Sequence, residues 1–591
     1  MILIKMLYFK VVLTIALLLT FPFCRLSAQS KFINELELRD NAKIDLNRWQ
    51  KEGNDLKVAF GSIDIRYLRH QVPELMLNNE IKITAWRGER VNIQIVIWSG
   101  SNNYAINTKP SDLTTTGMQI SATAVKAFPV RYVLTDARTT YSLAPDMLDN
   151  PGTFSISGKS SRPIWITIDV PAKAKPAIYK GYIEIKAKGG FKKELHYILE
   201  VQDRVLPNPS EWQYHLDLWQ HPWAVSRTSA VNPWSKEHWE ALRSSLTMLA
   251  NAGQKCISTT LIHNPLKGQI FDPYESMVDW RKSPDGSWTY DFALFDQWVE
   301  FAMSCGIKAQ INCYSMIPRD NSCRYFDETD NEYKIFTAVP GGPDFENHWR
   351  PFLLAFREHL KNKRWLDKTC IAMDYCGLPE MLSVIKLIKA TTPELKIAFA
   401  GGYHPEIVDD VFDLSLLIDP LSDTSSVSNT FKTVKLKRWN SRHWPTTFYT
   451  SFSKPEHPKN FTFSPLAENT LMGWYAIAAG YKGFLRSGYQ SWGKDPEHDA
   501  RFESEPEGDS YMVYPGARSS IRFERLREGI QDYEKIRILR ETFEKEGTEK
   551  AKQKLKRLNE MLKGITLKNI SADNASIIVN KGKGILNELS R

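Results

Sequence analysis

The strongest constraint on the fold is a regular alternation of short apolar segments with helical patterns between residues 213 and 486. Residues 378–389, for example, carry apolar side chains at helical spacing on one face. Such alternation indicates a parallel sheet covered by helices, and eight strand–helix units predict a (β/α)8 TIM barrel. Eight candidate strands can be counted: Gln213–Trp219, Cys256–Ile262, Ala309–Ser315, Thr369–Asp374, Lys396–Gly401, Leu414–Asp419, Thr446–Ser451 and Tyr481–Arg486.

Residues 29–207 follow a different pattern, in which short stretches alternate between apolar and polar side chains and are separated by Gly, Pro and Asn clusters. Period-two alternation at this spacing predicts an antiparallel β-sandwich. The clearest strand candidates are Val91–Trp98, Pro163–Val170, Tyr182–Ala187 and Leu195–Val201. The segment Asp203–Glu211, which contains two prolines, predicts a linker, so we expect the barrel domain to occupy residues 208–545.

The chain after about residue 519 is predicted to be helical. Residues 521–540 place Phe523, Leu526, Ile530 and Tyr533 on one stripe, with acids and arginines elsewhere. We expect these charged residues to form a solvated, ion-paired face. Residues 546–591 are predicted to form a C-terminal helical tail on the surface.

The first 28 residues are typical of an export signal. Lys5 and Lys10 precede the apolar run Val11–Phe23, and small residues end the segment at Ala28. We therefore expect a periplasmic or secreted protein without a membrane span. Removing Lys5, Lys10 and Arg25 lowers the formal charge from +9 to +6, which is a weak field for so long a chain and argues against nucleic acid as a partner.

Six cysteines remain after the signal segment, and none of them forms a CxxC pair. We expect them to be small buried residues, and the one disulfide that we consider joins Cys313 and Cys323. The chain also lacks HExxH, GxSxG and phosphate-loop motifs. The sequence therefore predicts neither a metal site nor a cofactor.

The chemistry of a TIM barrel lies at the carboxyl ends of its strands. Here those ends carry carboxylates, imidazoles and aromatic rings, a combination that suits a carbohydrate site because rings pack on the apolar faces of sugars. The candidate sugar-binding residues are Asp217, Trp219, Tyr314, Tyr403, His404, Tyr489 and Trp492, and His263 and Asp419 also follow strands. The structural alternatives are an ion pair for Asp217, a structural hydrogen bond for His404, and loop packing for the rings of Tyr489 and Trp492.

The run from residue 212 to residue 540 resembles glycoside hydrolase family 123. The resemblance is carried by stretches such as YHLDLWQHPWAV (214–225), IAMD (371–374), LKIAFAGGYHPEI (395–407) and FTFSPLAENTLMGWYA (461–476). It implies a retaining exo-β-N-acetylgalactosaminidase that acts on a glycan by substrate assistance, in which the 2-acetamido oxygen of the sugar attacks its own anomeric carbon.

The same resemblance assigns the catalytic pair. The family's Asp, which orients the acetamido group, corresponds to Asp374, but the position of the general-acid Glu is occupied by Tyr375. A phenol is a poor acid at neutral pH, so three interpretations stay open. Glu380 or another strand-end acid such as Asp419 could protonate the leaving group. The substrate could carry a good leaving group, or Tyr375 could act in a different role. The protein could also be a carbohydrate-binding pseudoenzyme.

Overall fold

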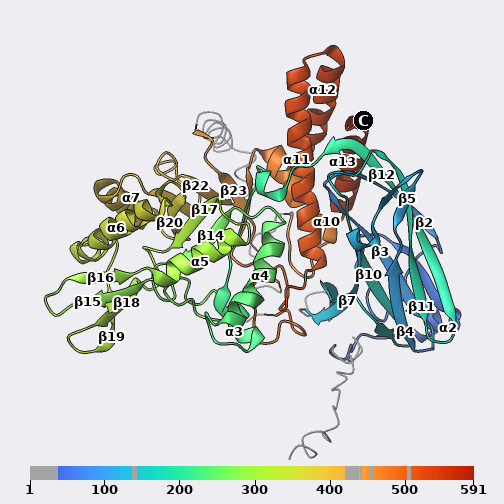
Figure 1. Ribbon diagram of the computed structural model, residues 1–591, viewed down its shortest axis with the longest axis horizontal. Coiled ribbons are helices and arrows are strands. Elements are labelled where there is room, and N and C mark those ends of the chain that lie inside the picture. Colours follow the sequence, from blue (N-terminus) through green and yellow to red (C-terminus); the bar gives the residue numbers. More distant parts are fainter. Residues whose placement is uncertain (1–36, 136–142, 419–437, 439–441, 452–456, 502–507) are drawn as a thin grey trace, which may run out of the picture.

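The computed structural model describes residues 37–135, 143–418, 438, 442–451, 457–501 and 508–591. A β-sandwich and a strand–helix barrel lie at opposite ends of the molecule, and the C-terminal helices lie between them (Figure 1). The export-signal prediction and Asp419 fall outside the described residues. No helix in the described part of the chain is both long and apolar enough to span a membrane.

The barrel contains all eight predicted strands, and every ladder within its sheet is parallel. The spatial order is β13-β24-β23-β22-β21-β20-β17-β14. The two ends of this path, β13 and β14, are joined by the isolated bridge between Leu216 and Gln254 and by side-chain hydrogen bonds of Gln254 and Gln220. The strands are β13 (His215–Leu218), β14 (Cys256–Thr260), β17 (Gln310–Tyr314), β20 (Thr369–Asp374), β21 (Lys396–Gly401), β22 (Asp413–Leu417), β23 (Thr446–Tyr449) and β24 (Gly483–Arg486).

Helices cover the outside of the barrel, as the sequence predicts. Their N-termini carry local signals such as Ser235, whose side chain accepts a hydrogen bond from the backbone N–H of His238. The connection between β21 and β22 contains no helix, which departs from the ideal pattern. The covering helices are α3 (Pro222–Ser229), α4 (Lys236–Ala250), α5 (Ala293–Ser304), α6 (Pro343–Lys363), α7 (Leu378–Thr391) and α10 (Leu466–Ala479).

A small four-stranded sheet, which the sequence analysis did not predict, extends from the barrel at the far side from the sandwich (Figure 1). Two of its strands follow β14 and two follow β17, so the sheet belongs to loops at the carboxyl ends of the barrel strands. Its spatial order is β16-β15-β18-β19. The strands are β15 (Asp279–Lys282), β16 (Trp288–Asp291), β18 (Ser322–Asp327) and β19 (Glu332–Thr337).

The N-terminal domain consists of two sheets that enclose an apolar core rich in isoleucine. Every ladder is antiparallel except the one between β2 and β12. One sheet is β1 (Leu56–Gly61), β3 (Arg90–Ser99), β10 (Ser160–Asp169), β7 (Val125–Leu134) and β8 (Leu143–Leu148). The other is β2 (Glu80–Arg87), β12 (Phe191–Val205), β11 (Ala177–Ala187), β4 (Tyr104–Pro110) and β9 (Phe154–Ile156). In addition, β5 (Leu113–Thr115) pairs with β11, and β6 (Met118–Ile120) pairs with β5. A short helix, α2 (Leu46–Lys51), precedes the sheets. Strand β12 runs to Val205, so the predicted linker begins inside the sheet.

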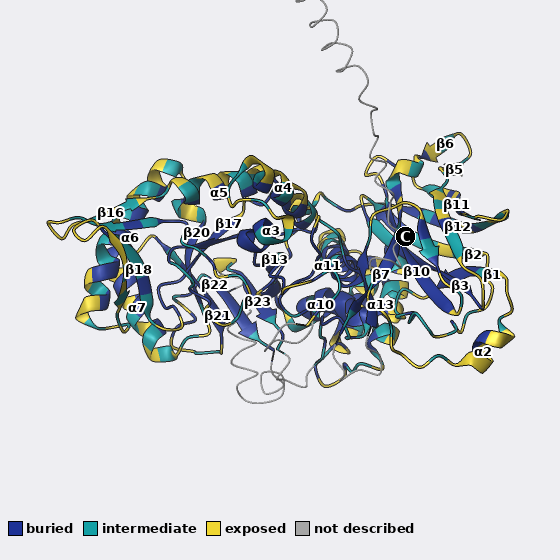
Figure 2. Ribbon diagram, turned by 90° about the horizontal axis from the view of Figure 1, so that it is seen from below, coloured by how far each residue is buried: buried dark blue, intermediate teal, exposed yellow. Residues whose placement is uncertain are grey.

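Three C-terminal helices, α11 (Ile521–Glu546), α12 (Glu549–Lys563) and α13 (Ala575–Leu589), follow the barrel. The prediction of a solvated charged face on α11 is wrong, because the sandwich covers that face. Arg522 Nε donates to Asp146 Oδ2 at 2.9 Å with both side chains fully buried, and Lys535 pairs with Glu89 at 3.0 Å. Ion pairing therefore offsets the free-energy cost of burying these charged side chains. Through these contacts α11 attaches the sandwich to the barrel (Figures 1 and 2).

The six cysteines in the described part of the chain are free thiols, and all but the half-buried Cys376 are buried. This confirms their interpretation as small buried side chains. Cys313 lies in β17 and Cys323 in β18, and the two are not joined by a disulfide.

Candidate active site

Asp374 is the last residue of β20 and lies at the carboxyl edge of the barrel, as predicted. The backbone N–H of Tyr375 donates to the Ala400 carbonyl at 2.9 Å, which continues the pairing with β21 by one residue. Tyr375 has a positive φ of 44°, and helix α7 begins three residues later, after its N-cap Gly377. A sharp turn between strand and helix therefore fixes the position of the Asp374 side chain.

Polar residues from other barrel loops surround the Asp374 carboxylate. Gln269, from the loop after β14, directs Nε2 at Asp374 Oδ2 at 3.4 Å. Burial raises the pKa of Asp374 to about 6, although the Gln269 hydrogen bond and the positive charge of Arg319 act in the opposite direction. At the end of β23, burial raises the pKa of Tyr449, and the nearby Asp374 charge adds to the effect. Asp374 thus titrates near neutral pH among groups suited to hydrogen bonding with a sugar.

Tyr375 does not take the place of a buried acid. Its side chain is 73% exposed, so the phenol lies at the outer edge of the site. Glu380 is the third residue of α7, and its carboxylate folds back over Gly377, where a Cβ atom would collide with it. A carboxylate in the first turn of a helix is stabilised by the helix dipole. In this conformation Glu380 Oε2 is buried against the start of α7 and has no hydrogen-bond partner in the described part of the chain.

Three predicted sugar-binding residues are buried within or directly after β13 and β17. Trp219 and Tyr314 are 1% and 3% exposed, and their ring centroids are 4.5 Å apart. Asp217 is 1% exposed and accepts a hydrogen bond from Asn312 Nδ2 at 3.1 Å. Burial, followed by the charge of Asp413, raises the pKa of Asp217 to about 7. Asp217 thus faces the barrel interior, because the alternation of side chains along β13 directs it inward.

Tyr403 and His404 follow β21, the strand beside β20, and both are half-buried. Burial, together with the charge of Glu406, raises the pKa of Tyr403. The His404 ring lies 6.5 Å from that of Phe399. These two side chains therefore remain at the same edge of the sheet as Asp374, as predicted.

Tyr489 and Trp492 do not form the open stacking wall that we expected. Tyr489 is fully buried and its Oη donates to the Ser245 carbonyl at 2.9 Å, while Trp492 is 2% exposed and donates from Nε1 to the Val513 carbonyl at 2.7 Å. Both rings are used for packing against neighbouring loops and helices. The loop-packing alternative describes them correctly.

The sequence analysis missed several polar residues at the carboxyl edge. Glu275 Oε2 contacts His263 Nδ1 at 2.9 Å and Arg324 Nη2 at 2.8 Å, so a charged cluster connects the loop after β14 to the small sheet. Gln269 and Arg319 were missed because they lie within long loops. Tyr449 ends β23, so its position at a strand terminus could have identified it.

Comparison with known proteins agrees with this architecture. Residues 219–539 match the family model described as "Glycoside hydrolase 123, catalytic domain", and residues 60–187 match "Glycoside hydrolase 123 N-terminal domain". A family 123 glycoside hydrolase from Clostridium perfringens, described in a study of glycolipid glycan hydrolysis, shares 26% identity with a TM-score of 0.81, and the match covers 90% of this chain and 97% of that chain.

A family 39 glycoside hydrolase from Bacteroides cellulosilyticus WH2 is a more distant match. It shares 11% identity, with a TM-score of 0.35 over 76% of this chain and 81% of that one. No curated protein matches the chain significantly. The catalytic-domain model covers more than half of the chain and the two folds agree over nearly their whole lengths. The chain therefore belongs to glycoside hydrolase family 123.

Proposed function

We propose that this protein hydrolyses terminal β-linked N-acetylhexosamine, with N-acetylgalactosamine as the preferred sugar, by a substrate-assisted retaining mechanism. The observation that carries the proposal is the position of Asp374 at the end of β20, where polar residues from three other strand–loop units surround its carboxylate. The likeness to a family 123 enzyme studied in glycolipid glycan hydrolysis supports a glycoconjugate substrate.

In this mechanism the acetamido oxygen of the bound sugar attacks the anomeric carbon as the bond to the leaving oxygen breaks. The ionised Asp374 accepts the acetamido N–H, which stabilises the positive charge of the resulting oxazoline-type intermediate. Water then attacks the anomeric carbon and restores the acetamido group. Because its pKa is about 6, Asp374 is mostly ionised at pH 7 and can serve this role.

The step that this chain handles poorly is protonation of the leaving oxygen. A carboxylic acid in this position contributes roughly 10²–10⁴-fold to the rate, and the exposed phenol of Tyr375 is a much weaker acid. We therefore propose that turnover is reduced on sugars with basic leaving groups. The substitution also favours a second candidate function, that of a carbohydrate-binding pseudoenzyme that retains the site without hydrolysis.

The test combines assays of nitrophenol release with a calorimetric measurement of ligand binding. Nitrophenyl β-N-acetylgalactosaminide has a leaving group that needs no acid, so wild-type protein should release nitrophenol and Asp374→Asn should not. Calorimetry with a thiazoline mimic of the intermediate then separates the candidates. Tight binding with nitrophenol release supports the enzyme, and tight binding without release supports the pseudoenzyme. Absence of both, with the N-acetylglucosaminide also inert, would overturn both proposals.

A further inference from the structure

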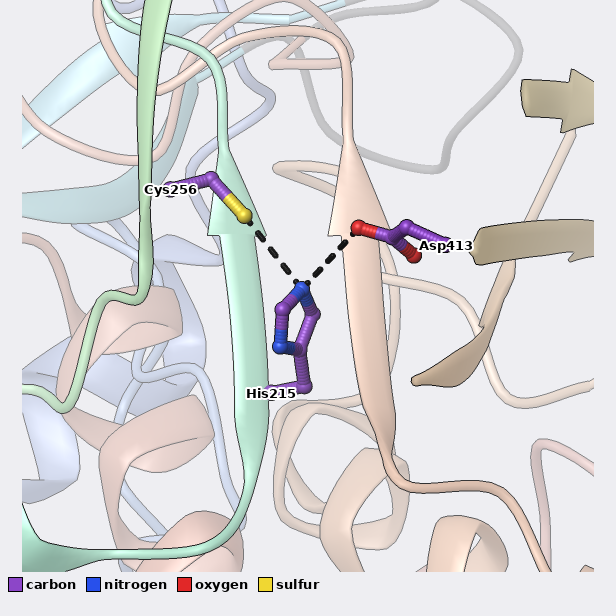
Figure 3. A group of neighbouring side chains, drawn as sticks. All are labelled: His215, Cys256 and Asp413. Atoms are coloured by element: carbon purple, nitrogen blue, oxygen red, sulfur yellow. Dashed lines mark hydrogen bonds and ion pairs between the residues drawn. The ribbon is translucent and has the colours of Figure 1, made fainter. Parts of the chain in front are cut away.

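A second cluster of reactive side chains lies at the opposite end of the barrel from Asp374. His215, Cys256 and Asp413 are the first residues of β13, β14 and β22, so they meet at the amino-terminal end of the sheet (Figure 3). His215 Nε2 lies 3.3 Å from Cys256 Sγ and 3.2 Å from Asp413 Oδ2. One ligand atom from each residue lies within 4.8 Å of the other two.

Four side chains that can ligate a metal meet in this cluster, because Cys256 also lies within hydrogen-bonding reach of Asp217. The Nε2 atom of an imidazole carries at most one proton, so it cannot donate to Cys256 and to Asp413 at once. Asp413 Oδ2 also accepts from Gln310 Nε2 at 2.7 Å. Once the thiol and Nε2 have lost their protons, nitrogen, sulfur and oxygen atoms that can ligate one cation lie close together.

Two neighbouring carboxylate oxygens support the same conclusion. Asp413 Oδ1 and Asp217 Oδ1 are buried without a hydrogen-bond partner in the described part of the chain, and the two residues are only 4% and 1% exposed. An unpaired buried carboxylate oxygen costs free energy that a bound cation would offset. Both residues also line a cavity of about 10 Å³ beside the cluster, which has space for roughly one water molecule and is not lined by His215 or Cys256.

We propose that His215, Cys256 and Asp413 bind a structural Zn²⁺ ion, with Asp217 or one water molecule as the fourth ligand. Zinc accepts mixed N, S and O ligands, whereas magnesium and calcium require oxygen. Zinc–ligand distances of about 2.0–2.3 Å in a tetrahedron place neighbouring ligand atoms roughly 3.3–3.6 Å apart, close to the two observed separations.

The site lies at the seam between the two ends of the barrel sheet. His215 and Cys256 begin β13 and β14, which one backbone bridge and the side chains of Gln254 and Gln220 join, so a shared ion would add a further link at this seam. The His215 side chain is 12% exposed, which gives an ion access from the amino-terminal face. The sequence analysis predicted no metal because it searched for paired ligands, whereas here Cys256 and Asp413 lie 41 and 198 residues from His215.

The direct test is the metal content of the full-length wild-type protein, measured by mass spectrometry after incubation with zinc and dialysis against metal-free buffer. We expect about one zinc ion per chain, a lower melting temperature after chelation, and recovery with zinc but not with magnesium. Cys256→Ser should lose the ion. Cys313→Ser, which changes another fully buried barrel cysteine, should retain it.

Cobalt loading of the wild-type protein provides a readout that needs no variant. Cobalt bound by Cys256 should show thiolate-to-metal charge-transfer absorption, and this band should disappear when zinc is added. Wild-type protein that retains no zinc, cobalt binding without the thiolate band, or equal zinc retention by Cys256→Ser and wild type would each overturn the proposal. These measurements are independent of glycosidase activity.

Discussion

Replacing Asp374 with Asn should make the protein more stable and less active at the same time. Burial raises the pKa of this carboxyl from 3.8 to about 6, so the folded state binds the proton more tightly than the unfolded state does. The difference between these two pKa values corresponds to a destabilisation of about 3 kcal/mol. This cost is absent below about pH 4 and fully present above about pH 6. Asp374→Asn should therefore gain up to about 3 kcal/mol at pH 7.5 and almost nothing at pH 4.

The same variant should lose about 10²–10³-fold in turnover of the nitrophenyl substrate, because the neutral amide cannot stabilise the charged intermediate. Denaturant unfolding at the two pH values and initial rates at pH 7.5 provide the two readouts. Asp146→Asn is the matched control: it removes a charge that pairs with buried Arg522, so it should destabilise the protein. An Asp374→Asn variant that is less stable at pH 7.5 and retains activity would show that Asp374 has a structural role and would refute the reasoning.

Three further predictions concern the site and its surroundings. Tyr375→Glu should raise turnover on sugars with poor leaving groups by up to about 10²–10⁴-fold, and an unchanged rate would show that the missing acid is not the main defect. The wild-type kcat/KM should rise with pH through about 6 as Asp374 ionises, whereas a profile without a change there would contradict the assigned role. Tyr489→Phe removes a buried hydrogen bond to Ser245, so it should cost about 1 kcal/mol of stability without changing KM; a raised KM would place this ring in the sugar site.

The eight barrel strands were predictable because parallel strands are buried on both faces and appear as continuous apolar runs. β20 and β21 begin and end at the predicted residues. The four-stranded sheet was missed because its strands are short and rich in polar residues, and four of the six residues in β19 are exposed. The buried charges of α11 were misjudged because their partners, such as Asp146 and Glu89, lie in the other domain.

The positions of candidate site residues could be predicted only for those that lie at the end of a barrel strand. Asp374, Tyr403 and His404 follow directly from the strand-end rule. Asp217 and Tyr489 do not, because the direction of a side chain and the packing of a ring depend on neighbouring elements. The same limit applies to the cluster around His215, whose members come from three strands and share no local motif.

The central claim is that Asp374 acts on the acetamido group of a bound sugar, and the most direct test compares two substrates that differ only in that group. Wild-type protein should release nitrophenol from nitrophenyl β-N-acetylgalactosaminide and leave nitrophenyl β-galactoside, which has a hydroxyl at carbon 2, essentially intact. Asp374→Asn should abolish the difference by losing the first activity. Equal hydrolysis of both substrates by the wild-type protein would contradict substrate assistance and the role of Asp374 in it.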